Sequence, residues 1–264
     1  MLKLGWFSTG RGAGSRNLLR LVQEEIIRGE IPATIQFVFQ NREHGEAEGS
    51  DLFQDLVHSF GLPLVPFSSQ RFRKERAVSS FTEVREEYDI AAMDLLNDFQ
   101  PDICVLAGYM LYASEQLCKQ FTMINTHPAL PNGPIGTWPQ VIWELIDGKA
   151  TETGAMVHLA TEKWDRGPVI SYFSFPLTGA LFDSLWANAS GQSIEKLRNT
   201  FGEKLELFQR IREEGAKREP YLLLETIRDL SQGSVRVVGR QVTDNQGNPI
   251  GSYCLNDRIE ATFK

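Results

Sequence analysis

The sequence predicts an α/β protein with a Rossmann-like, mostly parallel sheet flanked by helices, and a C-terminal helical and β-hairpin extension. Two observations support this prediction. Over the first two-thirds of the chain, short apolar runs alternate with longer segments of helical spacing, which is typical of successive strand–helix–strand units. Around Thr178-Gly179-Ala180 this alternation ends. We therefore expect a Rossmann-like domain over residues 1–178 and an extension over 179–264 that packs on the same domain.

Each strand is predicted from a short apolar run. The runs lie near residues 2–7, 34–39, 63–66, 103–107, 122–125, 154–159 and 169–175. Their length and apolar character suit strands buried on both faces of a sheet. Because helical segments separate most of them, neighbouring strands are expected to run in parallel.

Helices are predicted where apolar residues recur every three or four positions. These segments are 15–28, 50–60, 82–99, 114–120 and 137–147. Within 82–99, for example, Val84, Tyr88, Ala91 and Leu95 lie on one helical face. Pro101 ends that helix and prepares the next strand.

The extension after residue 178 has a different character. Two polar helices are predicted over 193–214 and 218–231. A glycine-punctuated, β-like tail follows, and the run Asp-Asn-Gln-Gly-Asn-Pro over 244–249 predicts its turn.

Composition limits the kinds of partner. The chain has 264 residues, of which 42% are hydrophobic, so it is long enough to bury a sizeable core. Its 27 Lys and Arg against 34 Asp and Glu give a formal net charge of −7. This charge argues against nucleic acid as a partner, because phosphate backbones are bound by positive surfaces.

Cysteine and histidine spacing gives no sign of a disulfide framework or a metal site. The three cysteines lack CxxC spacing, and no His, Cys and carboxylate cluster has metal-ligand spacing. The N-terminal apolar run is too short for a signal peptide, and no run reaches membrane-spanning length. We expect a cytoplasmic protein that binds no metal and no membrane.

A glycine-rich segment lies between the first predicted strand and the first predicted helix. It reads Ser-Thr-Gly-Arg-Gly-Ala-Gly-Ser-Arg-Asn over residues 8–17. Glycines let backbone N–H groups approach an anion closely, and the N–H groups at a helix start favour negative charge. We interpret the segment as a phosphate-binding turn, distinct from a Walker loop. The alternative is a flexible strand-to-helix turn.

A second candidate binding segment follows the predicted strand 103–107. The chain runs into Gly108 and then into the aromatic and apolar residues of 109–113. This place corresponds to the carboxyl edge of the sheet, where open α/β folds bind ligands. A flat aromatic ligand suits such a surface; the alternative is ordinary core and loop packing.

The residues with the strongest chemical signal are Asn125, His127 and Asp165. Asn125-Thr-His-Pro closes an apolar run, and Asp165 lies in Trp-Asp-Arg-Gly-Pro. An amide can donate to a developing oxyanion, and an imidazole can supply a proton or a positive charge near neutral pH. An aspartate close to His127 is expected to raise the pKa of the imidazole by opposite charge. The alternative is a structural histidine and a turn aspartate.

The remaining histidines are interpreted as packing residues. His44 lies in a polar segment, His58 in an amphipathic helix, and His158 in an apolar run. Surface or core packing is the favoured interpretation for each.

Three motifs together resemble the folate-dependent formyltransferases. They are Asn-Thr-His-Pro-Ala-Leu-Pro over 125–131, Thr-Gly-Ala-Met-Val-His over 153–158, and Asp-Arg-Gly-Pro-Val-Ile over 165–170. Their order and spacing are nearly those of the family. The resemblance covers about 2–178 and continues more weakly to about 243.

The resemblance implies formyl transfer from the co-substrate 10-formyltetrahydrofolate to an amine. It implies that Asn125 and His127 stabilise the oxyanion of a tetrahedral intermediate. Asp165 is expected to keep His127 charged and to order a proton-relaying water. The residues expected to bind the folate are Arg85, Met110, Leu111, Tyr112, Ala113, Ala160, Thr161 and Glu162.

Within the family, the chain is most similar to the enzymes of purine biosynthesis that formylate glycinamide ribonucleotide. The residues that resemble their phosphate contacts are Gly12, Gly14, Ser15, Arg16 and Asn17. Glu219 falls where those enzymes place a glutamate on the ribose.

The chain departs from the family pattern around both predicted pockets. Leu111 stands where an arginine is expected, and residues 136–140 replace a Gly-x-His-x-His segment. A different acceptor, namely a sugar amine, an aminoacyl-tRNA or water, is therefore an alternative. A second alternative is a non-catalytic folate or nucleotide binding module. The expected assembly is a monomer or a homodimer.

Overall fold

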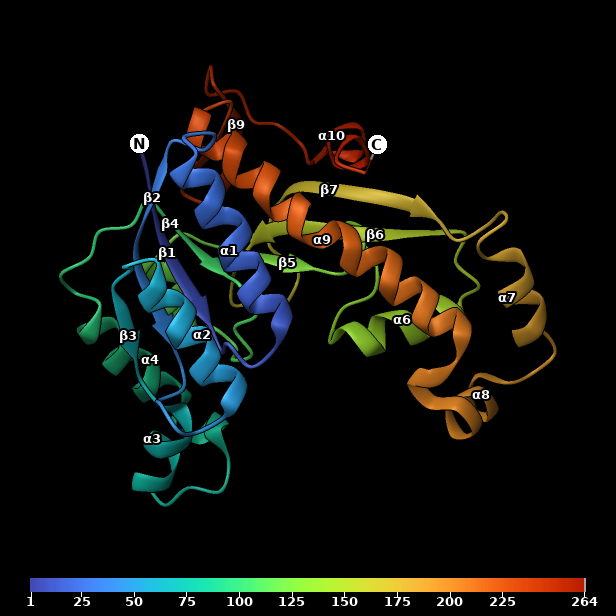
Figure 1. Ribbon diagram of the computed structural model, residues 1–264, viewed down its shortest axis with the longest axis horizontal. Coiled ribbons are helices and arrows are strands. Elements are labelled where there is room, and N and C mark those ends of the chain that lie inside the picture. The colour runs from blue at the N-terminus through green and yellow to red at the C-terminus, as the bar shows by residue number, and fades with distance from the viewer. Residues whose placement is uncertain (264) are drawn as a thin grey trace. The chain divides into compact units, whose positions relative to one another are not determined.

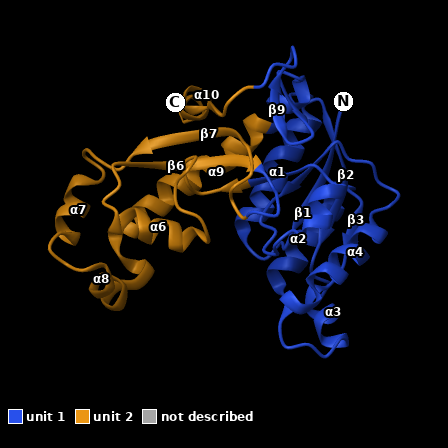
Figure 2. Ribbon diagram, turned by 180° about the vertical axis from the view of Figure 1, so that it is seen from behind, with its two compact units in different colours: residues 1–125, 159–163, 227–249 blue, residues 126–158, 164–226, 250–264 orange. Residues whose placement is uncertain are grey.

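The computed structural model describes residues 1–263, which divide into two compact units (Figure 2). Unit 1 comprises residues 1–125, 159–163 and 227–249. Unit 2 comprises residues 126–158, 164–226 and the described residues from 250 onward. Each unit is therefore assembled from separate stretches of the chain. The domain boundary expected at residue 178 stays a prediction.

Unit 1 is built on parallel strands in the order β5–β4–β1–β2–β3 (Figure 1). Their bounds are β1 (Leu2–Ser8), β2 (Ala33–Gln40), β3 (Leu64–Pro66), β4 (Ile103–Leu106) and β5 (Met123–His127), of which β5 ends in unit 2. In the central register, Trp6 pairs with Val38 on one side and with Val105 on the other. For these five strands the predicted parallel direction is confirmed, whereas the predicted strands 154–159 and 169–175 are antiparallel to each other.

Helices flank this sheet. They are α1 (Ala13–Ile27), α2 (Glu48–Ser59), α3 (Ser69–Glu75), the 3₁₀ turn η1 (Phe81–Val84), α4 (Arg85–Leu95) and α5 (Glu115–Gln120). Figure 1 shows α1 and α2 together on one side of the strands. On the other side, Phe7 and Phe37 of the sheet form a buried cluster with Tyr88 of α4 and Leu117 of α5. The Rossmann-like prediction is confirmed for this unit.

Unit 2 is built on the antiparallel pair β6 (Glu152–Leu159) and β7 (Val169–Pro176). The short strand β10 (Tyr253–Cys254) runs parallel to β7. The helices of the unit are α6 (Trp138–Asp147), α7 (Asp183–Ala189), α8 (Ile194–Phe201), the turn η2 (Gly202–Lys204), α10 (Asn256–Ala261) and α9 (Glu206–Gln232) as far as residue 226. The two long strands approach closely at Gly154, where a Cβ would lie 1.8 Å from the carbonyl oxygen of Phe173.

The prediction of two polar helices over 193–214 and 218–231 is wrong. The structure has the short helices α7 and α8 and then one continuous helix, α9, with Pro220 inside it. The buried apolar residues of α9 continue on both sides of the proline; they are Leu207, Phe208, Ile211, Leu222, Leu223, Leu224, Ile227 and Leu230. Proline removes one backbone hydrogen bond, and packing of this stripe outweighs the loss.

No helix among the described residues is long and apolar enough to cross a membrane.

The predicted C-terminal hairpin is confirmed, but with a different turn. It consists of β8 (Val235–Val238) and β9 (Gln241–Asp244), both in unit 1. Val238 pairs with Gln241, so the hairpin turn is Gly239-Arg240. The predicted turn over 244–249 is a second turn, in which the Asp244 carboxylate accepts backbone N–H groups at 2.9 and 2.8 Å.

Candidate active site

His127 ends strand β5, and only 2% of its surface is exposed. The chain turns directly after it, and the N–H of Ala129 donates to the His127 carbonyl at 2.9 Å. The loop then returns, so that the carbonyl oxygen of Pro134 lies 2.8 Å from Nε2 of the imidazole. Because a carbonyl oxygen can only accept, Nε2 carries a hydrogen and donates it.

Asp165 brings its carboxylate between two imidazoles in unit 2. Its Oδ2 lies 3.4 Å from Nδ1 of His127, and its Oδ1 lies 3.6 Å from Nε2 of His158. The N–H of Gly136 donates to Oδ2 at 3.4 Å. Asp165 also has a backbone φ of +49°, a left-handed conformation that costs energy for a non-glycine residue and recurs at functional sites. The structure thus brings His127 and Asp165 together.

His158 is a site residue that the sequence did not reveal. It was expected to be a packing residue, and it is indeed 2% exposed in β6. Its ring centroid lies 6.5 Å from that of His127, at an interplanar angle of 81°. The sequence did not reveal this role because the neighbours of His158, Val157 and Leu159, are apolar and buried, so the segment has the pattern of any buried strand. Only the contact with Asp165 distinguishes it.

The expectation that the pKa of His127 is raised is wrong. Burial of the ring lowers the pKa of His127 below its ordinary value; the Pro134 carbonyl and Asp165 oppose that effect without overcoming it. Burial raises the pKa of Asp165, but the close approach of His158 and the charges of both histidines outweigh it, so this pKa is lowered. The site therefore holds an ionised carboxylate beside an imidazole that favours its neutral form.

Asn125 lies two residues before His127 on β5. It pairs in register with Leu106 of β4, within unit 1. Because strand side chains alternate between faces, Asn125 and His127 project from the same face of β5.

The loops after β1 and β4 are joined by hydrogen bonds in unit 1. The N–H of Thr9 donates to the Gly108 carbonyl at 3.0 Å, and the N–H of Met110 donates to Oγ1 of Thr9 at 2.9 Å. Gly108 has a φ of +68°, and a Cβ there would lie 2.4 Å from Oγ of Ser15 in α1. These contacts build one polar edge at the carboxyl ends of the strands, as predicted from sheet geometry.

The other predicted folate residues lie on two loops of unit 1, at 110–113 and 160–163. Met110 is exposed, Ala113 is buried, and Leu111, Tyr112, Ala160 and Thr161 are partly exposed. The Tyr112 hydroxyl donates to the backbone carbonyl of Glu162, which joins the two loops. The N–H of Ala160 donates to the carbonyl of Met123 at 2.8 Å, which anchors the second loop to β5.

Arg85 is turned toward the interior of unit 1. It is 7% exposed, and its Nε and Nη2 donate to Oδ2 of Asp89 at 3.1 and 2.9 Å. The same oxygen accepts the N–H of Ser114 at 2.8 Å. Ser114 caps the start of α5, so the Arg85–Asp89 pair supports the end of the 110–113 loop.

The predicted phosphate turn is shorter than expected, because α1 begins at Ala13. Gly12 is the N-cap, and Gly14, Ser15, Arg16 and Asn17 lie within the helix. Gly12, Gly14 and Asn17 are exposed, whereas Nη1 of Arg16 donates to the Gly49 carbonyl at 3.0 Å. The N-cap, Gly12, has no side chain to cap α1, and the first N–H groups of a helix have no acceptor within the helix, so this turn suits an anion.

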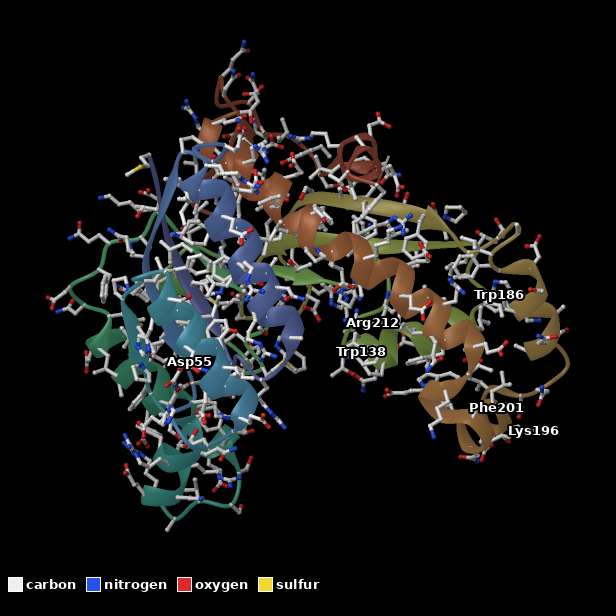
Figure 3. All side chains as sticks on the ribbon, viewed as in Figure 1. Asp55, Trp138, Trp186, Lys196, Phe201 and Arg212 are labelled. Carbon is white, nitrogen blue, oxygen red and sulfur yellow. The ribbon has the colours of Figure 1, made fainter. Side chains whose placement is uncertain are left out.

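Glu219 lies on α9 at a pocket within unit 2. The lining residues are Pro128, Trp138, Ile142, Leu145, Thr153, Gly154, Phe175, Ile211, Arg212, Gly215 and Glu219. Nη1 of Arg212 lies 2.9 Å from Oε1 of Glu219, and its guanidinium carbon lies 4.8 Å from the centre of the Trp138 ring (Figure 3). Burial raises the pKa of Glu219, against the effect of the Arg212 charge. Pro128, which follows His127, lines the same pocket.

Comparison with known proteins identifies similar sequences and folds. Residues 13–178, more than half of the chain, match the formyl transferase family. The phosphoribosylglycinamide formyltransferase of Escherichia coli is 31% identical over 169 residues, which cover 62% of this chain and 70% of that protein. The formyltetrahydrofolate deformylase of Escherichia coli is 26% identical over 162 residues, which cover 60% of this chain and 53% of that protein.

Solved structures agree with the fold. Glycinamide ribonucleotide transformylase 1 from Symbiobacterium toebii superposes with a TM-score of 0.64 and 21% sequence identity. The superposition covers 92% of this chain and 94% of that one. At this identity, the likeness supports the fold alone.

Proposed function

Because the chain belongs to the formyl transferase family, we propose that it transfers the formyl group of 10-formyltetrahydrofolate to the amine of glycinamide ribonucleotide. The observation that carries this proposal is the Asp165 carboxylate between the imidazoles of His127 and His158. Transfer of a formyl group between two nitrogen atoms requires proton movement, and a buried carboxylate–imidazole pair supplies it. Binding alone needs no such pair.

In the proposed reaction, the amine nitrogen attacks the formyl carbon and the carbonyl oxygen becomes an oxyanion. Asn125 and the Nε2–H of His127 donate hydrogen bonds to this oxygen. His127 then exchanges the Pro134 carbonyl, which Nε2 contacts at 2.8 Å, for the substrate oxygen. The attacking amine loses a proton, N10 of the folate gains one, and the bond between the formyl carbon and N10 breaks.

Asp165 supports the proton movement. His127 starts neutral, because burial holds its pKa low, and positive charge that develops on its ring is stabilised by the ionised carboxylate beside Nδ1. His158 contacts the other carboxylate oxygen. We assign His158 as a positioning residue that fixes the direction of the Asp165 side chain.

The co-substrate is proposed to bind along the loops at 110–113 and 160–163. Exposed Met110 offers an apolar surface to a flat ring, and the Tyr112 contact with Glu162 joins the two loops. Arg85 acts indirectly in this proposal, since its charge is paired with Asp89.

The acceptor is proposed to bind its phosphate at the start of α1. The N–H groups at the start of the helix, at Gly12, Gly14 and Ser15, favour an anion, and Arg16 and Asn17 add side-chain donors. In unit 2, Glu219 is proposed to accept a ribose hydroxyl, and Arg212 positions its carboxylate. An overall net charge of −7 makes such local donors necessary for a phosphorylated substrate.

Hydrolysis of the formyl group is the second candidate function. The observation that favours it is the similarity to a formyltetrahydrofolate deformylase, together with the departures at Leu111 and 136–140. The same His127–Asp165 pair can activate water in place of an amine.

Product analysis separates the two functions. Purified protein is incubated with 10-formyltetrahydrofolate that carries a labelled formyl group, with and without glycinamide ribonucleotide. We expect label in the formylated amine only when the ribonucleotide is present, and we expect His127→Ala to slow its appearance about 10²- to 10⁴-fold. Release of labelled formate at the same rate with and without the ribonucleotide contradicts the proposal and favours hydrolysis.

A further inference from the structure

The loop at 160–163 is held by a residue from the far end of the chain. Arg240, at the tip of the β8–β9 hairpin, forms a two-point contact with the Glu162 carboxylate. Its Nη1 lies 3.3 Å from Oε1, and its Nη2 lies 3.0 Å from Oε2. Both residues belong to unit 1. A planar guanidinium facing both carboxylate oxygens fixes direction as well as distance.

The hairpin geometry fixes Arg240 at this place. The ladder runs from Val235 opposite Asp244 to Val238 opposite Gln241, which leaves Gly239-Arg240 as a two-residue turn. Gly239 has a φ of +60°. Glycine with positive φ at the first turn position matches the right-handed twist of the strands. The turn therefore directs Arg240 outward from the hairpin end in one orientation.

Glu162 is consequently held at two points. The Tyr112 hydroxyl donates to its backbone carbonyl, and Arg240 holds its side chain. Tyr112 comes from the 110–113 loop and Arg240 from the hairpin, so three separate segments meet at one residue. Within the loop, Thr161 and Lys163 contact each other, and at its start Ala160 is anchored to Met123.

We propose that Arg240 is a positioning residue that orders the 160–163 loop for the folate co-substrate. This inference rests on the proposed function, in which that loop and Tyr112 contact the folate. Arg240 and Glu162 have side chains that are 54% and 37% exposed, so their contact adds little to global stability. We expect the contact to reduce the mobility of the 160–163 loop instead. A loop that is already ordered loses less conformational entropy when the folate binds.

The first test is the Michaelis constant for 10-formyltetrahydrofolate. Arg240→Ala is expected to raise this KM about twofold to fivefold with little change in kcat. This is the change in affinity that corresponds to the loss of one exposed ion pair. Arg236→Ala is the matched control, because Arg236 is an exposed arginine of the same hairpin and leaves the Glu162 contact intact.

The second test needs no turnover. Amide hydrogen exchange of the 159–163 segment, in protein without ligand, should be faster in Arg240→Ala than in wild type or Arg236→Ala. An unchanged KM and unchanged exchange in an active protein would overturn the inference and leave the proposed function standing. A wild-type protein that neither turns over the formyl folate nor binds tetrahydrofolate would overturn the proposed function and, with it, the folate role of Arg240.

Discussion

The Asp165 carboxylate lies 3.4 Å from Nδ1 of His127, while the Nε2 of the same ring donates to the Pro134 carbonyl. Both ring nitrogens therefore face oxygen acceptors. Burial nonetheless lowers the pKa of His127. The ring is thus neutral at neutral pH. If Nδ1 takes up a second proton, the Asp165 carboxylate beside it stabilises the resulting positive charge. This combination suits a group that handles a proton transiently.

The pKa of His127 can be measured directly. We expect its ring to titrate below the ordinary histidine value of 6.5. Asp165→Asn should lower the pKa further, because the neutral amide no longer favours the charged ring. NMR titration of the histidine ring protons measures both values, with His127→Ala used to assign the resonance. A pKa of His127 above 6.5 in wild type, or an unchanged pKa in Asp165→Asn, contradicts this electrostatic description.

Stability should fall at acid pH for the same reason. The folded pKa of His127 lies below its unfolded value, so the unfolded state binds more protons as the pH falls below about 7. Asp165 has a folded pKa below its ordinary value of 3.8, so its contribution is lost only at still lower pH. We expect the free energy of unfolding, measured with urea, to decrease between pH 7 and pH 5. His127→Asn should show a smaller decrease over this range; an equal decrease assigns the pH dependence to other groups.

Glu219 should affect binding of the acceptor. Glu219→Gln keeps the size of the side chain but removes the charge that holds Arg212 at 2.9 Å. We expect the KM for glycinamide ribonucleotide to rise about tenfold, with kcat and the KM for the folate nearly unchanged. A tenfold rise corresponds to the loss of one hydrogen bond to a charged group. Glu213→Gln is the matched control on the exposed face of α9. Equal effects of the two substitutions exclude Glu219 from the acceptor site.

The β6–β7 pair depends on Gly154. A Cβ at this position would lie 1.8 Å from the Phe173 carbonyl oxygen and 2.9 Å from Cδ2 of Leu130, whose loop follows His127. Gly154→Ala should therefore lower the free energy of unfolding by about 1–3 kcal/mol, as for an overpacked core. Gly251→Ala is the control, since nothing lies within 4 Å of its added Cβ. Urea unfolding of both variants measures the difference; equal stability would contradict the close approach seen here.

Local patterns in the sequence predicted the sheet well and the extension poorly. Strands such as 103–107 are buried on both faces, so their apolar runs identify them without tertiary information. The sequence predicted a break between residues 214 and 218, but α9 is continuous there and through Pro220, with buried residues on both sides. A proline removes only one hydrogen bond, and the packing that compensates is not visible in local sequence.

Only part of the candidate site was predicted, because the rest depends on tertiary contacts that local sequence does not show. The contact between His127 and Asp165 followed from motif order, whereas His158 was hidden among apolar neighbours and Arg240 in a polar tail. The pKa of His127 was predicted with the wrong sign, because its burial depends on the loop that returns to Pro134. Desolvation is a tertiary effect, and sequence spacing reveals the charge partner without the burial.

A double-mutant cycle on His127 and Asp165 decides whether these two residues act together in formyl transfer. The rate constant kcat/KM is measured with 10-formyltetrahydrofolate and glycinamide ribonucleotide for His127→Ala, Asp165→Ala and the double variant. We expect each single substitution to reduce the rate about 10²- to 10⁴-fold and the double substitution to reduce it little further, since groups that act as a unit are not additive. Single variants within about threefold of wild type, or losses that multiply in the double variant, would contradict a shared catalytic role.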